Sequence, residues 1–210
     1  MPKHVRPAFA ALWSLDLALA DVVATSTDPR LGAIRLAWWR ERLDQLGEAD
    51  LVPAEPRLQA IVAELLPPGI TGSELSRLED GWLSLLEPFP WSEAQAEALR
   101  FRGRILFGIG ARLLDEYPSD AEAAGALWSL VDGARHCSDP ESRSFLLAEA
   151  RKAVSEYPAS RPPKRLRRLT ALAAIAARDA LRNDPSLSRA YWGRPVAALV
   201  HHLRGTLPRN

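Results

Sequence analysis

The chain has 210 residues, 47% of them hydrophobic, which is enough for one sizeable core. Its 27 basic and 26 acidic residues leave a formal net charge of +1 at pH 7. This balance argues against a general nucleic-acid binder, because such proteins depend on a large positive charge. Cys137 is the sole cysteine, which excludes an intrachain disulfide and favours a reducing compartment.

Apolar residues recur at three- and four-residue steps through the first half of the chain, which is the period of an α-helix. Helices are predicted over 8–24, from Asp28-Pro29 to about Leu46, over 56–66, and from Ser73 past Leu85. Asp16 and Asp21 interrupt the apolar run of the first helix. We therefore expect neither a signal peptide nor a membrane span, and a cytoplasmic location.

The second half of the chain has the same helical period. Helices are predicted over 93–116, 120–136, 140–155, 164–182 and 186–204, the last interrupted at Pro195. Ser92-x-x-Gln95 and Ser119-x-x-Glu122 have the form of capping boxes, and Asp139-Pro140 repeats the cap-plus-proline pattern of Asp28-Pro29.

No segment alternates apolar and polar residues with the period of a strand. The sequence therefore predicts an all-α fold. Because the connections are short, we expect a single domain over 1–210, built as one bundle of about eight or nine antiparallel helices.

The segment RLAWWRERLD, residues 35–44, carries two adjacent tryptophans. Trp39 shares a helical row with Leu36 and Leu43, so we expect it to face the interior. Trp38 falls in a second row with Leu31 and Ile34, which predicts a helix buried on two sides between different neighbours.

The stretch LWSLDLALADVVATSTDPRLGAIRLAWWRERLD, and IRLAWWRERL above all, resembles the squalene/phytoene synthase family. The resemblance implies an isoprenoid (terpenoid) synthase fold around an apolar cavity. It places Arg35, Trp38, Trp39 and Arg42 at that cavity. Catalytic members join two prenyl diphosphates with magnesium, held by two acidic clusters on facing helices.

Both acidic clusters are reduced in this chain. The first retains Asp21, with Asp16 five residues upstream, and the second reads Arg135-His136-Cys137-Ser138-Asp139. Asp139 is better placed to cap the helix that begins at Pro140. We assign no catalytic residue beyond the residual candidates Asp21 and Asp139, and no metal site. The opening helices most resemble the branch of the family that acts in respiratory complex I assembly.

Other polar groups have two interpretations each. Glu79-Asp80 could rebuild a metal site with Asp16 and Asp21, or form a solvated face. The adjacent His201 and His202 point apart on a helix, which is poor geometry for one ion. Cys137, beside His136, is expected to be a buried or half-buried thiol rather than a nucleophile.

A basic segment precedes the penultimate predicted helix. It comprises Arg161, Lys164, Arg165, Arg167 and Arg168. Positive charge at a helix N-terminus opposes the helix dipole. The segment is either a solvated linker or a surface for anionic head groups, a phosphate-bearing ligand or an acidic partner.

The sequence thus predicts a non-catalytic protein that binds an isoprenoid or other hydrophobic ligand, or assists respiratory-complex assembly. The alternatives are a divergent magnesium-dependent prenyl transferase and a peripheral membrane adaptor. We expect no cofactor unless the transferase alternative holds. The expected partners are a prenyl or hydrophobic ligand, a protein, or an anionic membrane surface at the inner face of a membrane, and no nucleic acid.

Overall fold

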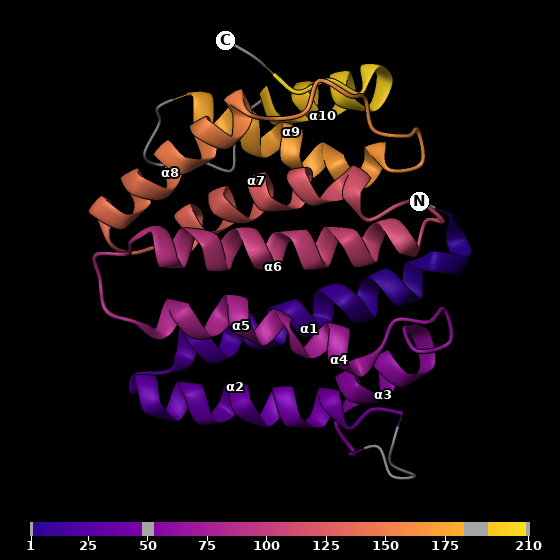
Figure 1. Cartoon of the computed structure of the whole chain (residues 1–210), viewed down its shortest axis with the longest axis vertical. Coiled ribbons are helices and arrows are strands. Elements are labelled where there is room, and N and C mark those ends of the chain that lie inside the picture. Colours follow the sequence, from indigo (N-terminus) through magenta and orange to yellow (C-terminus); the bar gives the residue numbers. More distant parts are fainter. Residues whose placement is uncertain (1, 48–52, 183–192, 209–210) are drawn as a thin grey trace. The chain divides into compact units, whose positions relative to one another are not determined.

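The computed structural model describes residues 2–47, 53–182 and 193–208. Every regular element in these residues is a helix, and none is a strand (Figure 1). This confirms the predicted all-α class and is consistent with an isoprenoid synthase fold. The chain divides into two compact units, Met1–Pro88 and Phe89–Asn210. The single domain over 1–210 stays a prediction.

In the described residues, the first unit consists of two long helices and several short ones. Its elements are η1 (Lys3–Val5), α1 (Arg6–Thr25), α2 (Pro29–Asp44), α3 (Pro56–Glu64), α4 (Gly72–Ser76), α5 (Leu78–Leu83) and η2 (Ser84–Leu86). The helix predicted from Ser73 is therefore divided among α4, α5 and η2. A capping box of Thr71 and Glu74 begins α4 earlier than expected.

The segment Lys3–Thr25 is long and apolar enough to cross a membrane by length and composition alone. About half of its apolar window is buried, and Leu12, Leu15 and Leu19 are fully enclosed. A buried core helix passes the same length-and-composition test. The expectation that the chain has no membrane span stays a prediction.

The second unit contains five long helices. They are α6 (Glu93–Arg112), α7 (Ser119–His136), α8 (Pro140–Ser155), α9 (Arg167–Leu181) and α10 (Gly193–Arg204). The capping box at Ser92 and Gln95 is confirmed, as is the Asp139 cap. The box at Ser119 is wrong, because α7 begins at Ser119 itself and Pro118 occupies the cap position.

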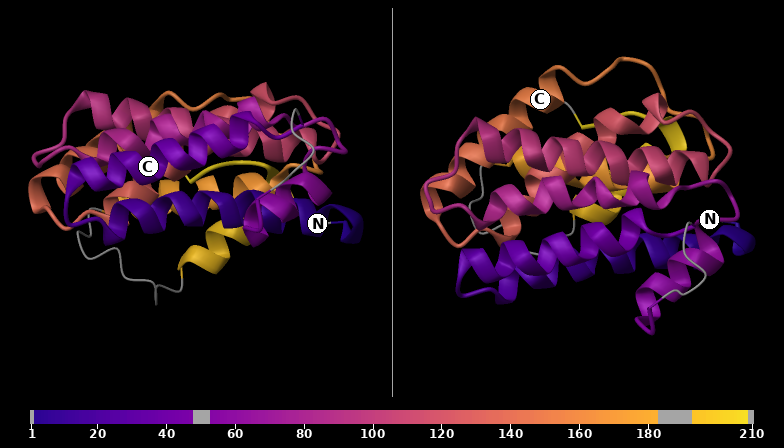
Figure 2. Two further views of the ribbon diagram at one scale, coloured as in Figure 1. Left: turned by 90° about the horizontal axis from the view of Figure 1, so that it is seen from below. Right: turned by 60° about the horizontal axis from the view of Figure 1, so that its bottom comes forward.

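α6 and α7 lie side by side and antiparallel (Figure 2). Their backbones touch at two glycines. A Cβ atom on Gly125 would lie 2.0 Å from the carbonyl oxygen of Gly103, and one on Gly103 would lie 2.1 Å from that of Gly125. Only glycine allows this separation of the helices, since any side chain would have to displace backbone.

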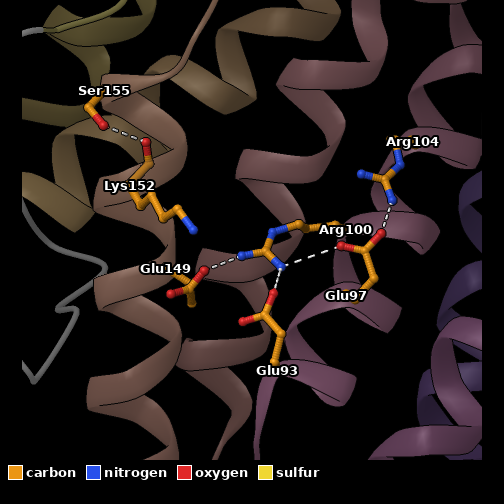
Figure 3. A network of polar contacts seen from close by, with 7 residues as sticks. All are labelled: Glu93, Glu97, Arg100, Arg104, Glu149, Lys152 and Ser155. Carbon is orange, nitrogen blue, oxygen red and sulfur yellow. Dashed lines mark hydrogen bonds and ion pairs between the residues drawn. The ribbon is translucent and has the colours of Figure 1, made fainter.

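A polar network ties α6 to α8 (Figure 3). Arg100 of α6 donates to Glu93 at 2.6 Å and also pairs with Glu149 of α8. The side chains of Arg100 and Glu149 are mostly buried, so solvent screens this pair less than it screens an exposed one.

α9 and α10 pack antiparallel. Arg194, at the start of α10, pairs at 2.9 Å with Asp179, near the end of α9. Thr170, near the start of α9, bonds His201 near the end of α10. The helix runs through Pro195 without a break from Gly193 to Arg204, so the predicted interruption at Pro195 is wrong. The predicted helical residues 186–192 lie outside the described residues.

Gly125→Ala is expected to lower the free energy of unfolding by about 1–3 kcal/mol, because its methyl group would overlap the Gly103 backbone. Urea denaturation measures the loss. Gly108→Ala on α6 is the matched control, because its Cβ would meet Pro118 at an ordinary 3.4 Å. The control should gain up to about 1 kcal/mol from helix propensity. Equal stability of both variants would contradict the glycine contact.

Candidate functional site

α2 carries the segment singled out by sequence, and its two sides have different environments. Asp28 caps the helix, accepting from the Arg30 backbone N–H at 2.8 Å, and Pro29 is its first residue. One side is buried and contains Gly32, Leu36, Trp39 and Leu43. The opposite side exposes Leu31, Ile34 and Trp38. The prediction that α2 is buried on two sides is therefore wrong, because these three apolar side chains are exposed.

The two tryptophans occupy different environments, and Trp39 faces the interior as its position predicts. Trp39 is 7% exposed, whereas Trp38 is 40% exposed. Their ring centroids lie 5.2 Å apart with planes inclined at 82°, the edge-to-face arrangement that aromatic quadrupoles favour. Trp38 therefore covers one edge of Trp39 and presents its remaining surface to solvent.

Arg35 and Arg42 lie on the exposed side of α2. Arg35 is exposed and donates to Thr25 Oγ1 at 3.3 Å. Arg42 is half-buried, and its Nε atom is enclosed without a hydrogen-bond partner in the described part of the chain. Its Nη2 atom lies 3.5 Å from the exposed carboxylate of Glu41. Because solvent screens this partly exposed pair, the outer nitrogens of Arg42 can also contact an added anionic group.

Arg40 forms a cluster with two acids that sequence reasoning did not connect to it. Its Nη1 donates to Glu79 at 2.9 Å and to Asp80 at 3.0 Å. Glu79 is 2% exposed, so the interpretation of Glu79-Asp80 as a solvated face is wrong for Glu79. A buried acid needs a cation, but the sequence does not reveal that Arg40, 39 residues earlier, supplies it.

The Glu79 carboxyl has a pKa above its ordinary value of 4.5 because burial disfavours the charged form, and this outweighs the attraction of Arg40. The pKa of Arg40 is also raised, chiefly by the charge of Asp80. Arg40 is 45% exposed at its side chain, so its pairing with the exposed Asp80 is screened and contributes little.

The acids of the first predicted cluster are separated by their environments. Asp16 is buried and accepts from the Trp82 indole Nε1 at 3.0 Å. Asp21 is exposed, and its backbone oxygen accepts from the Thr25 hydroxyl at 2.6 Å. The structure does not bring these two carboxylates to one face of α1.

The acid of the second predicted cluster is a helix cap. Asp139 accepts from the hydroxyl of Ser142 at 2.6 Å and from its backbone N–H at 2.8 Å. These hydrogen bonds lower the pKa of Asp139. Arg135 is paired with Asp179, and His136 is exposed. Asp139 therefore has the structural role that its position before Pro140 predicts.

Magnesium, which the resemblance implies for catalytic relatives, does not fit these residues. The ion prefers near-octahedral oxygen ligation, which needs converging carboxylates. Within the described residues no group of three or more His, Cys, Asp or Glu side chains is placed to hold a metal ion. Glu79 and Asp80, which the sequence offered for a metal site, are already paired with Arg40.

The basic segment is largely exposed. Arg161, Lys164, Arg165 and Arg168 are exposed, and Arg165 lies 3.7 Å from the exposed Asp115. Arg167 differs, because it donates to the backbone carbonyls of His202 at 3.3 Å and Leu203 at 2.9 Å. Arg167 thus caps the end of α10, whereas the other four cations face solvent.

The histidines and the cysteine lie as their positions predict. His201 is buried between Thr170 Oγ1 at 2.8 Å and the Thr206 carbonyl at 3.1 Å, while His202 is exposed. Burial lowers the pKa of His201. Cys137 is 3% exposed, and burial raises the pKa of its thiol, which confirms the expectation of a buried thiol.

Trp39→Ala is expected to lower the free energy of unfolding by about 3–5 kcal/mol, as a large-to-small change in a core. Trp38→Ala, its matched control on the exposed side, should cost about 1 kcal/mol through the lost ring contact. Chemical denaturation of both variants measures the difference. Equal losses would show that Trp38 is as enclosed in solution as Trp39.

Glu79→Gln is expected to change the pH dependence of stability. Because the folded-state pKa of Glu79 is raised, its contribution to stability is fully present below pH 4.5 and is lost as the pH rises through the folded-state pKa. Wild type should therefore have the higher free energy of unfolding near pH 4.5, and its difference from Glu79→Gln should shrink toward neutral pH. Urea titrations at several pH values measure this difference. Asp80→Asn should keep the wild-type trend. An advantage that grows with pH would mean that the ion pair with Arg40 outweighs burial.

Comparison with known proteins identifies one similarity. Residues 1–77 match the family model described as squalene/phytoene synthase. Neither the curated proteins nor the solved structures include a match to this chain. The matched residues span α1 to α4 and include both tryptophans of α2. The similarity to the squalene/phytoene synthase family is thus limited to residues 1–77 of the 210.

Proposed function

We propose that this protein does not catalyse prenyl transfer but acts by binding, either to an isoprenoid or other hydrophobic ligand or to a protein during respiratory-complex assembly. The observation that carries the proposal is that most of the residual acids already form hydrogen bonds or ion pairs within the fold. Asp16 accepts from an indole, Asp139 caps a helix, and Glu79 is paired with Arg40.

These hydrogen bonds and ion pairs argue against magnesium-dependent catalysis. Ionisation of a prenyl diphosphate needs metal ions to neutralise the leaving group. Asp139 would have to release Ser142 to ligate an ion, and Glu79 and Asp80 would have to release Arg40. Asp21 alone among these acids is free of such side-chain commitments in the contacts described above, and one carboxylate cannot organise a metal cluster.

The exposed side of α2 supports a binding role. Leu31, Ile34 and Trp38 present apolar surface, and Arg35 and Arg42 lie on the same side. Apolar surface with nearby guanidinium groups suits an amphiphilic anion such as a prenyl phosphate, and equally an acidic, apolar protein segment. The family similarity over residues 1–77 includes this helix.

The purified protein with magnesium is expected not to convert farnesyl or geranylgeranyl diphosphate. Product formation is measured by extraction and mass spectrometry against a blank without protein. Turnover above the blank that is lost in Asp21→Asn would overturn the proposal and support the divergent transferase.

Titration with geranylgeranyl phosphate, followed by Trp fluorescence, separates the two binding roles. Arg42→Gln should weaken binding about tenfold or more, the loss expected for a hydrogen bond to a charged group. Arg30→Gln, on the same helix, is the matched control and should bind as wild type does. If wild type does not bind the prenyl phosphate, the ligand role is wrong and a protein partner is left.

A further inference from the structure

The exposed face of α10 is apolar. Four side chains spaced three and four residues apart form what we name the α10 stripe: Val196, Leu199, Val200 and Leu203, with exposed fractions of 60%, 58%, 39% and 66%. On an ideal helix these positions fall within an arc of about 100°. A surface helix of a globular protein normally exposes polar residues, so α10 has the reverse arrangement.

The rotation of α10 about its axis is fixed by contacts on the opposite face. Ala197 and His201 are buried, and His201 bonds Thr170 of α9. Arg194 donates to both carboxylate oxygens of Asp179 at 3.0 Å. These contacts at both ends hold α10 against α9, so the α10 stripe must point away from it.

The basic segment lies beside the end of this stripe. Arg167 reaches the backbone carbonyls of His202 and Leu203, which places the start of α9 next to the last residue of the α10 stripe. Neither 158–168 nor 193–208 contains an Asp or Glu residue. Arg204 is exposed at the end of α10 itself, and the segment that Arg167 joins to the end of the α10 stripe has the exposed cations Arg161, Lys164, Arg165 and Arg168. Asp115, an exposed acid, lies 3.7 Å from Arg165, and the other four cations form no ion pair within the described residues.

We propose that the α10 stripe and the basic segment together form a docking surface for an anionic lipid bilayer, with α10 lying in the plane of the membrane interface. The apolar side chains enter the boundary between head groups and acyl chains. The cations contact anionic head groups. The proposal concerns residues 161–168 and α10, and it is independent of the function proposed above.

The charge pattern favours lipid over the other occupants of an apolar face. A second copy whose α10 packed parallel to this one would bring the two basic segments together, and like charges repel. A copy packed antiparallel would separate the basic segments but would offer neither of them an anionic partner. An anionic bilayer offers an apolar interior and negative charge over a continuous plane, which matches both parts of the surface.

The test is co-sedimentation of the full chain with vesicles of phosphatidylcholine and phosphatidylglycerol. Wild type should bind, and binding should weaken as salt shortens the screening length below about 10 Å. Leu199→Gln/Leu203→Gln should abolish binding. Lys164→Gln/Arg165→Gln/Arg168→Gln should reduce the partition coefficient about a hundredfold. Arg167 is left unchanged because it caps α10.

Two control variants match these changes in chemistry but lie outside the surface. Leu17→Gln replaces a leucine of α1 that is 62% exposed, and Lys3→Gln/Arg6→Gln/Arg30→Gln removes the same charge from the first unit. Both should bind vesicles as wild type does. Circular dichroism checks that every variant is folded.

Three results would overturn the proposal. The first is that wild type binds the vesicles containing phosphatidylglycerol no more strongly than it binds pure phosphatidylcholine vesicles. The second is undiminished binding by the folded α10 double variant. The third is a concentration-dependent dimer, seen by sedimentation velocity, that Leu199→Gln/Leu203→Gln dissociates while vesicles fail to bind wild type, because the stripe would then be an interface between copies.

Discussion

The contact between Gly103 and Gly125 determines how α6 and α7 lie against each other, and the second unit depends on it. Because the two backbones touch, the register of the helices is fixed there. That register places Arg102, which is 2% exposed, within 3.1 Å of Asp132 and 4.9 Å from the centre of the Trp128 ring. A buried guanidinium is tolerated only with such partners, so the glycines and the Arg102 contacts require one another.

A comparable constraint operates in the first unit. A Cβ atom on Gly72 would lie 2.0 Å from the carbonyl oxygen of Leu43, so α4 begins directly against the end of α2. The same approach allows Ser76 to donate to Asp44 at 2.6 Å. On α5, Glu79 then meets Arg40. One side of α2 is thus occupied by α4 and α5, and this leaves Leu31, Ile34 and Trp38 exposed on the other.

The polar groups of both units serve mainly to fix helices. Asp16 accepts a hydrogen bond from an indole, Asp139 from the backbone at the start of a helix, and Asp179 from an arginine. The surfaces for which we propose binding are those where α2 and α10 expose apolar residues. Exposed apolar area costs roughly 25 cal/mol per Å², so a surface of this kind is stabilised by whatever covers it.

The sequence determined the class and the local signals of this fold. Helical periodicity predicted nearly all the long helices, and the Asp28 and Asp139 caps follow from short-range chemistry between neighbouring residues. The row that Trp39 shares with Leu36 and Leu43 also predicted that this ring is buried. The similarity to squalene/phytoene synthases was visible in the same helix.

Tertiary structure alone decided which helix faces are covered. Apolar residues on two sides of α2 predicted burial on both sides, but one side is exposed. A periodic pattern shows which residues share a side of a helix, not whether another helix packs against that side. For the same reason, nothing in the sequence paired Arg40 with Glu79, or set Arg167 against the end of α10. Such contacts join residues more than thirty positions apart, and they depend on helix register, which the packing of backbones and side chains fixes only once the chain has folded.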